Sequence, residues 1–292
     1  MSNAVNHKNN FSAGKLTQVL SGLRVLAPQV DKEASWELLL NNIENQERFN
    51  QIRARVIKWG GFVLLLVVLT SIIYDWQFAK KNHVVPNGKL AFLVLPDSSV
   101  VSINAGSNVK YRQFGWSKTR KVHLTGEALF NINNKSQPFK VILNGYTISS
   151  NYGKFNVYYR SNEYIVKCIS GEVEVGYGDN QFRTITKGQA AHYSLNGNHL
   201  KVYPVDYLKI DSWTRGVFHY YQATALDVFS EIERQFNVKV DFEGVNPLDR
   251  LFTGFISNEN LTNTLNQVCY PLGLGYEIDK NKPIVRIYKV KE

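Results

Sequence analysis

At 292 residues the chain is long enough for two or three compact domains, and 44% apolar with 20% charged residues excludes a wholly disordered protein. The formal charge of +10 invites a nucleic-acid interpretation, but the basic residues are scattered along the chain, with no run typical of a phosphate-binding surface. We therefore expect a folded, multidomain protein that binds no nucleic acid directly.

Residues 1–57 predict a short helical tail with two apolar stripes at helical spacing. The stripes consist of Leu16, Leu20 and Leu23, and of Trp36, Leu40 and Ile43. Pro28 separates the two helices, and Asp31 can cap the second. A tail this small buries little surface, so the stripes either pack on each other or occupy a partner's groove.

Residues 58–76 predict one transmembrane helix. The run from Trp59 to Tyr74 contains sixteen residues without a charge, which is close to the ~17–25 residues that a spanning helix needs. Aromatic residues stand at both ends, where their amphipathic rings prefer lipid headgroups. A buried core helix is the alternative, and a cleaved signal peptide fits less well because no small-residue cleavage site follows. The basic residues on the two sides of the span differ little in number, so the positive-inside rule favours a cytoplasmic N-terminus only weakly.

Residues 77–87 are expected to form a linker with a Pro-Asn-Gly turn, and residues 88–203 an all-β domain. Short runs in this domain alternate polar with apolar or β-branched residues, and Gly, Asn or Asp interrupts them every 8–12 residues or so. This pattern is typical of a sandwich or barrel.

Residues 212–290 predict a small α+β domain made of two β-α-β units. At an offset of 36 residues the apolar helix positions coincide, so that Phe229 matches Leu265 and Ile232 matches Val268. Two copies cannot build a solenoid, so we expect them to share one core. The fold class is therefore mixed: a helical tail, one transmembrane helix, an all-β domain and an α+β domain.

The sequence contains no recognisable catalytic or cofactor motif, so we expect a non-enzyme without a metal or cofactor. The six histidines are dispersed, and Cys168 and Cys269 lack metal-site spacing. The cysteines are expected to be buried and unpaired, although one long-range disulfide is an alternative. Glu172 and Glu174 share a strand face, which is equally typical of an exposed surface.

Several motifs in the β region match, in order and spacing, the FecR family of membrane-spanning anti-sigma factors, which this chain resembles. They are LPDSSVVSINAGS (95–107), RKVHLTGEALFNI (120–132), PFKV (138–141), FNV (155–157), GEVEV (171–175) and KGQAA (187–191). Residues 213–288 likewise resemble the C-terminal domain of these regulators, which is similar to the short N-terminal (STN) domain of secretins and TonB-dependent receptors. The ASWELLLNNI segment before the span extends the resemblance over nearly the whole chain.

The resemblance implies a single-pass inner-membrane protein with a cytoplasmic N-terminus and a periplasmic C-terminus. Its tail would bind an extracytoplasmic-function sigma factor, and its periplasmic part would sense a TonB-dependent outer-membrane transducer. An apolar helical stripe suits the first task, so we assign the six tail residues above to sigma binding. The strand carrying Leu251, Thr253, Phe255 and Ser257 is our candidate for receiving a transducer segment.

Two other functions compete with this interpretation. A membrane-anchored envelope adhesion or scaffold protein would use the β domain and need no sigma partner. A membrane-tethered DNA binder would hold its isolated tail on duplex DNA with steep salt dependence.

One position departs from the family pattern. Many relatives carry Gly-Thr before the FNV motif, and some cleave themselves there through the threonine hydroxyl. Here the matching residues are Tyr152 and Gly153, which supply no nucleophile. We therefore expect an intact chain, in which any release of the tail depends on separate envelope proteases.

Overall fold

A computed structural model describes residues 31–78, 80–133, 137–161, 163–178, 181–194 and 199–290. The predicted positions Leu16, Leu20 and Leu23 lie outside these residues. The chain divides into two compact units, Met1–Ser71 and Ile72–Glu292, and each is described by itself.

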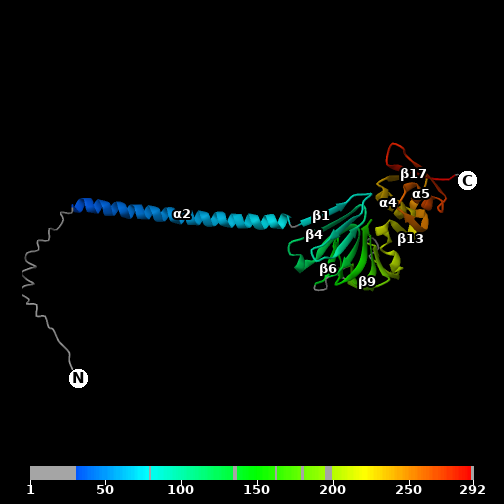
Figure 1. The fold of residues 1–292 in the computed structure, drawn as a ribbon, viewed down its shortest axis with the longest axis horizontal. Helices are drawn as coiled ribbons and strands as arrows, with labels where there is room; N and C mark the ends of the chain where they lie inside the picture. Colours follow the sequence, from blue (N-terminus) through cyan, green and yellow to red (C-terminus); the bar gives the residue numbers. More distant parts are fainter. Residues whose placement is uncertain are drawn as a thin grey trace, which may run out of the picture. The chain divides into compact units, whose positions relative to one another are not determined.

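One continuous helix, α2 (Lys32–Phe78), contains both the second tail helix and the predicted span (Figure 1). Asp31 caps it as predicted, since its Oδ1 accepts a hydrogen bond from the backbone N of Glu33 at 3.1 Å. Residues 44–58 contain no Pro or Gly that would interrupt the helix before the membrane segment.

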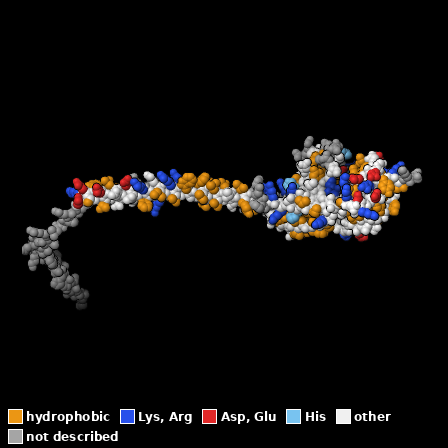
Figure 2. All heavy atoms as spheres, turned by 90° about the horizontal axis from the view of Figure 1, so that it is seen from above, with side chains coloured by type: hydrophobic (Ala, Val, Ile, Leu, Met, Phe, Trp, Pro, Cys, Tyr) orange, Lys and Arg blue, Asp and Glu red, His pale blue; other side chains and the backbone are white. Residues whose placement is uncertain are grey.

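The apolar part of α2 is long enough to cross a bilayer. Among the described residues it is the one helix that is long and apolar enough to do so, with a mean hydropathy of 2.3 over its most apolar window. None of that window is buried. Charged side chains are mixed with apolar ones in its N-terminal half, whereas apolar ones predominate in its C-terminal half (Figure 2). A buried core helix is thereby contradicted.

Twelve strands form the β body, as the alternating pattern predicted. They are β1 (Lys80–Val85), β2 (Ala91–Val94), β3 (Val100–Ile103), β4 (Ser107–Arg112), β5 (Lys121–Ile132), β6 (Phe139–Leu143), β7 (Tyr146–Ser150), β8 (Gly153–Arg160), β9 (Glu163–Tyr177), β10 (Gln181–Thr186), β11 (Gln189–Ser194) and β12 (His199–Pro204). A short helix, α3 (Trp116–Thr119), connects β4 to β5. The expected linker is wrong over 80–85, because β1 pairs along its whole length with β4.

The strands form two layers that share their longest members. Sheet A has the order β1-β4-β5-β6-β7-β9-β10, and sheet B has the order β2-β3-β5-β8-β9-β11-β12. β5 changes layer near Gly126 (φ 100°), where a Cβ would come within 2.7 Å of Ser107 atoms, so the bend needs glycine. Apolar side chains from both layers, including Phe130, Phe139 and Phe155, fill the space between the layers.

The C-terminal part consists of two β-α-β units and a final strand. The first unit is β13 (Val217–Thr224), α4 (Ala225–Phe236) and β14 (Lys239–Glu243); the second is β15 (Leu251–Ser257), α5 (Leu261–Cys269) and β16 (Leu274–Ile278), and β17 (Ile284–Lys289) follows. β13 pairs with β15, and β17 pairs with both β14 and β16. Phe229, Ile232, Leu265 and Val268 share one buried core, as the repeat predicted.

Candidate functional site

The first turns of α2 present an apolar stripe that nothing described covers. Trp36 is 64% exposed, and Leu40 and Ile43 are similarly exposed. Their i, i+4, i+7 spacing places them on one face of the helix. Five of the six charged residues in 31–47 are acidic, so this apolar stripe is set in a negatively charged segment. Such a surface suits a partner groove that combines apolar and basic groups.

The predicted receiving strand, β15, has one neighbour among the described strands. Its side chains alternate, and Leu251, Thr253 and Phe255 are exposed. At Ser257 the edge is already occupied, because Gln267 accepts a hydrogen bond from its backbone N at 3.2 Å and Thr264 donates to its carbonyl. The open part of the edge is therefore residues 251–255, without Ser257.

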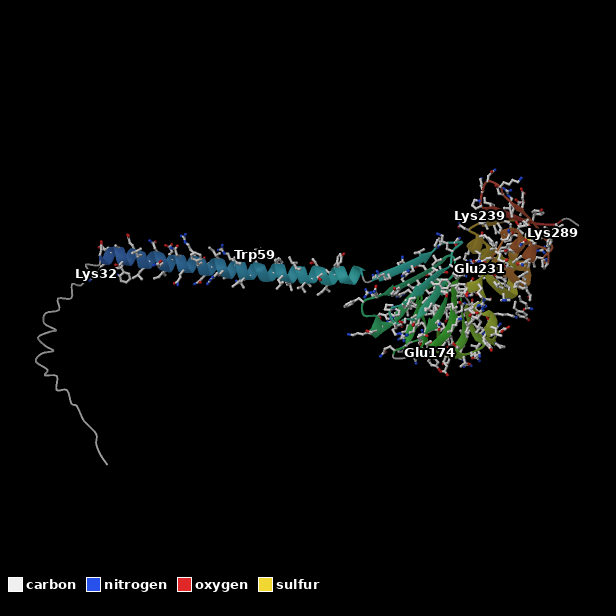
Figure 3. The ribbon with its side chains drawn as sticks, in the orientation of Figure 1. Lys32, Trp59, Glu174, Glu231, Lys239 and Lys289 are labelled. Carbon is white, nitrogen blue, oxygen red and sulfur yellow. The ribbon has the colours of Figure 1, made fainter. Side chains whose placement is uncertain are left out.

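A buried polar network joins the β body to the C-terminal part. The Nδ2 atom of Asn104 donates to Glu127 Oε2 at 2.9 Å and to Glu231 Oε1 at 3.1 Å. Asn104 and Glu127 belong to the β body, whereas Glu231 lies on α4, where Figure 3 labels it. One amide thus connects two carboxylates from two parts of the fold.

Cationic and amide groups surround the Glu231 carboxylate. Arg234 donates to its Oε2 through two nitrogens, at 2.9 and 2.7 Å, and Gln235 donates to its Oε1 at 2.7 Å. The same Gln235 amide donates to Asn104 Oδ1 at 2.8 Å. Because these bonds satisfy buried groups, the network specifies one docking arrangement of the two parts.

An aromatic contact extends the junction. Trp213 Nε1 donates to Asn156 Oδ1 at 3.0 Å, and Asn156 Nδ2 donates to Glu127 Oε1 at 2.8 Å. Leu129 of β5 packs in the C-terminal core rather than in the core of the β body. The two parts therefore share both polar and apolar contacts.

The sequence did not predict this junction. Glu127 belongs to the LTGEALF motif, where a carboxylate among apolar strand residues was the available signal that it needs a partner. The bonds to Glu127 come from Asn104 and Asn156, and Glu231, which accepts from the same Asn104 amide, is 104 positions further along the chain and looks like an ordinary helix-surface residue in the sequence.

Desolvation and the nearby Glu231 charge raise the pKa of Glu127. The protonated form is thus favoured by folding, and stability falls as pH rises from about 4.5 through the folded pKa. Glu127→Gln should remove this loss, because glutamine stays neutral and its carbonyl still accepts from Asn104 or Asn156. We expect urea titrations in micelles at pH 4 to 8 to show a flatter stability profile for the variant. An unchanged slope would contradict the assignment.

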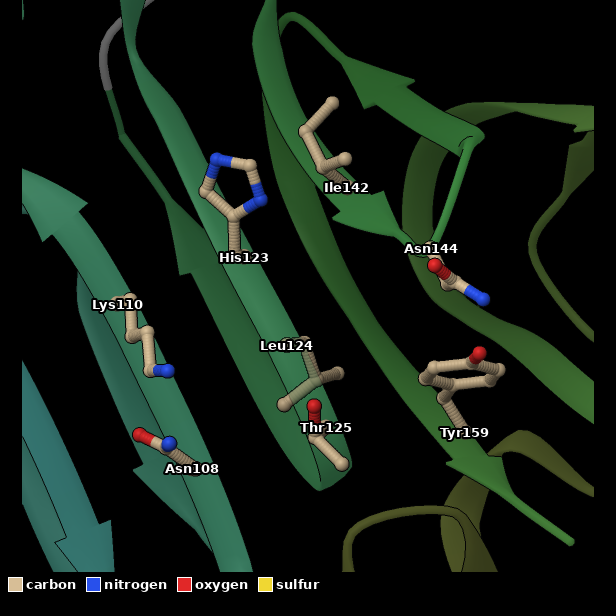
Figure 4. A pocket seen from close by; sticks show the side chains of 8 residues that line it. All are labelled: Asn108, Lys110, His123, Leu124, Thr125, Ile142, Asn144 and Tyr159. Atoms are coloured by element: carbon tan, nitrogen blue, oxygen red, sulfur yellow. The ribbon is translucent and has the colours of Figure 1, made fainter.

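A shallow pocket of about 390 Å³ opens on the outer face of sheet A (Figure 4). Lys110, His123, Thr125 and Tyr159 contribute polar groups to its lining. Burial and then the charges of Lys121 and Lys110 lower the pKa of His123, so the imidazole is held in its neutral form. The lining contains no carboxylate or cysteine that could act with this histidine.

Other groups that could carry chemistry have structural roles. Burial raises the pKa of the Cys168 thiol to about 11 and that of Cys269 to about 12, and both cysteines are free, as predicted. Glu172 and Glu174 are on an exposed strand face. Within the described ranges, no group of three or more His, Cys, Asp or Glu could hold a metal ion.

Gly153, which precedes the FNV segment and was expected to supply no nucleophile, is the first residue of β8. Ser150 Oγ donates to the Tyr152 carbonyl at 2.9 Å, and Gly153 adopts a φ of 117°. A Cβ at residue 153 would stand 2.2 Å from Ser170 O, so a threonine would not fit here. The missing nucleophile is therefore matched by a backbone that excludes one.

Comparison with known families matches two segments of the chain. Residues 82–174 match the model described as FecR protein, and residues 217–285 match the model described as FecR, C-terminal. Together the two segments make up more than half of the chain. No curated protein matches significantly.

The fold has solved relatives. Two crystal structures of a candidate anti-sigma factor from Parabacteroides distasonis ATCC 8503, at 2.50 and 1.65 Å resolution, match with a TM-score of 0.67 and 23% identity. The matches cover 73% and 72% of this chain and 100% of the solved chains. The likeness concerns the fold. On the two family models, which fall on the β body and on the paired β-α-β units, the chain belongs to the FecR family.

Proposed function

We propose that this protein is a single-pass inner-membrane anti-sigma factor, with α2 crossing the membrane between a cytoplasmic tail and a periplasmic body. Family membership and the likeness to a candidate anti-sigma factor support the regulatory role. The observation that carries the proposal is the exposed apolar stripe of Trp36, Leu40 and Ile43, continuous in one helix with an apolar span. Its partner is an extracytoplasmic-function sigma factor.

In this proposal the periplasmic body receives a signal from a TonB-dependent transducer. The C-terminal part, as a relative of STN domains, is the receiver, and the open edge at 251–255 accepts a transducer segment by strand addition. The junction network then couples α4 to the β body, from which β1 leads back to the membrane helix. An envelope scaffold would need no such tail stripe.

Trp36→Ala should weaken binding of the sigma factor by about 2 kcal/mol or more, because aromatic interface residues dominate such surfaces. Leu38→Ala is the matched control: Leu38 is 65% exposed and lies about 200° around the helix from Trp36. The sigma factor that co-purifies with the full chain would be titrated by calorimetry against each variant. Equal affinities for both would place the binding surface elsewhere, and no co-purifying sigma factor would overturn the function itself.

Phe255→Pro should abolish strand addition while keeping the β13–β15 ladder. Backbone groups alternate along a strand, so Phe255 N–H points, like that of Ser257, away from β13. Phe255→Ala keeps the N–H and separates the backbone effect from the side chain. Binding of the purified transducer signalling domain would be measured, with circular dichroism as the folding control. Undiminished binding by a folded proline variant would exclude this edge.

A further inference from the structure

The end of sheet A at which β1 begins carries several cations, and an exposed aromatic residue lies in the connection that follows β4 at this end. We call this set of residues the rim, and it consists of Lys80, Arg112, Phe114, Lys118, Lys121 and Lys140. Strand register brings four of these residues together: Lys80 pairs with Arg112, and Lys121 pairs with Lys140. Phe114 and Lys118 lie in the connection between β4 and β5 at the same end. The neighbouring Tyr111–Val122 pair places Arg112 beside Lys121. Positions spread over sixty residues of sequence thus form one surface.

The aromatic residue of the rim is held outward by a well-packed loop. Phe114 is 77% exposed, whereas Trp116, two residues later, is buried against Tyr111 and Phe139. Gly115 between them adopts φ 71°, a left-handed conformation that glycine permits. The exposure of Phe114 therefore comes from a fixed turn, and a bare aromatic ring costs free energy in water.

Cationic side chains far outnumber acidic ones on and beside the rim. The described residues of β1, β4, α3, β6 and the first half of β5 include no Asp or Glu. Lys118, Lys121 and Lys140 make no ion pair with a described residue, and the lowered pKa of His123 reflects the charges of Lys121 and Lys110 after burial. The neighbouring Arg120 does not contribute, because it is buried and paired with Asp97.

We propose that the rim binds the anionic phospholipid headgroups of the leaflet from which α2 emerges. This inference rests on the proposed membrane location of α2. Lys80 is two residues beyond the end of α2 at Phe78, so at most about 7 Å of chain separates the helix from the rim. Lysine and arginine are attracted to anionic headgroups, and a phenylalanine ring beside them can bury itself at the boundary between headgroups and acyl chains. The rim would thereby fix the orientation of the β body at the membrane surface.

The experiment uses the full chain in nanodiscs with the environment-sensitive dye NBD attached at residue 114 through Phe114→Cys. Both native cysteines are buried, so labelling is selective. In 7:3 phosphatidylcholine:phosphatidylglycerol we expect a blue-shifted NBD emission that headgroup spin labels quench, and a weaker response in pure phosphatidylcholine or in 1 M salt. Phe92→Cys is the matched control, since Phe92 is 67% exposed but lies away from the rim. Through β3 it aligns with Leu129, which is eight residues further along β5 than the rim residue Lys121.

Charge reversal tests the electrostatic part. In the double variant Lys118→Glu with Lys121→Glu, the ratio of membrane-bound to released rim should fall by about fivefold or more for each lysine removed. Lys201→Glu on β12 is the control and should leave this ratio unchanged. Near-UV circular dichroism checks folding. Equal NBD signals at residues 114 and 92, or no dependence on phosphatidylglycerol, would overturn the inference while α2 stays inserted. A chain that does not float with vesicles would instead overturn the proposed membrane location.

Discussion

Arg120→Met is expected to lower the free energy of unfolding by about 3–5 kcal/mol, because it leaves the Asp97 carboxylate buried without its counter-charge. Arg120 Nε donates to Asp97 Oδ2 at 2.7 Å, and the two side chains are 1% and 4% exposed. The guanidinium also donates to the Gln137 carbonyl and lies over the Phe139 ring. It therefore ties the loop before β5 to the loop before β6.

The control for this substitution is the double variant Arg120→Met with Asp97→Leu. Replacing a buried ion pair by apolar residues is often close to neutral, so the double variant should recover most of the lost stability. Denaturant titrations in micelles, followed by tryptophan fluorescence, measure both. If the double variant loses as much stability as Arg120→Met alone, the unpaired Asp97 charge is not the cause of the loss.

The Asp97–Arg120 ion pair also predicts a loss of folding stability in acid. Burial raises the pKa of Asp97, but hydrogen bonds from Ser99 and Arg120 outweigh it, so the net pKa is lowered. A carboxyl with a lowered folded-state pKa contributes stability above its unfolded pKa and loses it as pH falls through the folded value. The contribution of this pair should therefore persist at neutral pH and disappear in strong acid.

Trp213→Ala is expected to cost about 3–5 kcal/mol and to loosen the junction between the β body and the C-terminal part. The indole is buried in the C-terminal core, and its N–H donates to Asn156 of the β body. Removing it leaves a cavity and deprives Asn156 Oδ1 of its donor. We expect two separated unfolding transitions in place of one, measured by calorimetry of the full chain in micelles.

Trp213→Phe separates the two effects. It keeps much of the apolar volume and removes the hydrogen bond, so we expect a loss of about 1–3 kcal/mol. If both variants unfold in a single transition, the junction is held without Trp213, and the Asn104–Glu231 contact is the next one to test.

In the described part of the chain, local patterns predicted most of the elements, but not β1. Alternation predicted an all-β region over 88–203, and the offset of 36 residues predicted two β-α-β units with Phe229 and Leu265 in a shared core. These features depend on the spacing of apolar residues within one strand or helix, which is readable directly. The apolar run at 59–74 similarly determined a helix able to span a membrane.

The sequence by itself thus determined most of the elements, the candidate span and the apolar stripe at Trp36. Only the tertiary structure decided which distant residues meet. The Asn104–Glu231 contact joins residues 127 positions apart, β1 became a strand because β4 offers its edge, and the rim exists because strand register aligns cations that look scattered along the chain. Such contacts depend on pairing partners and register, and no spacing within a single element encodes them.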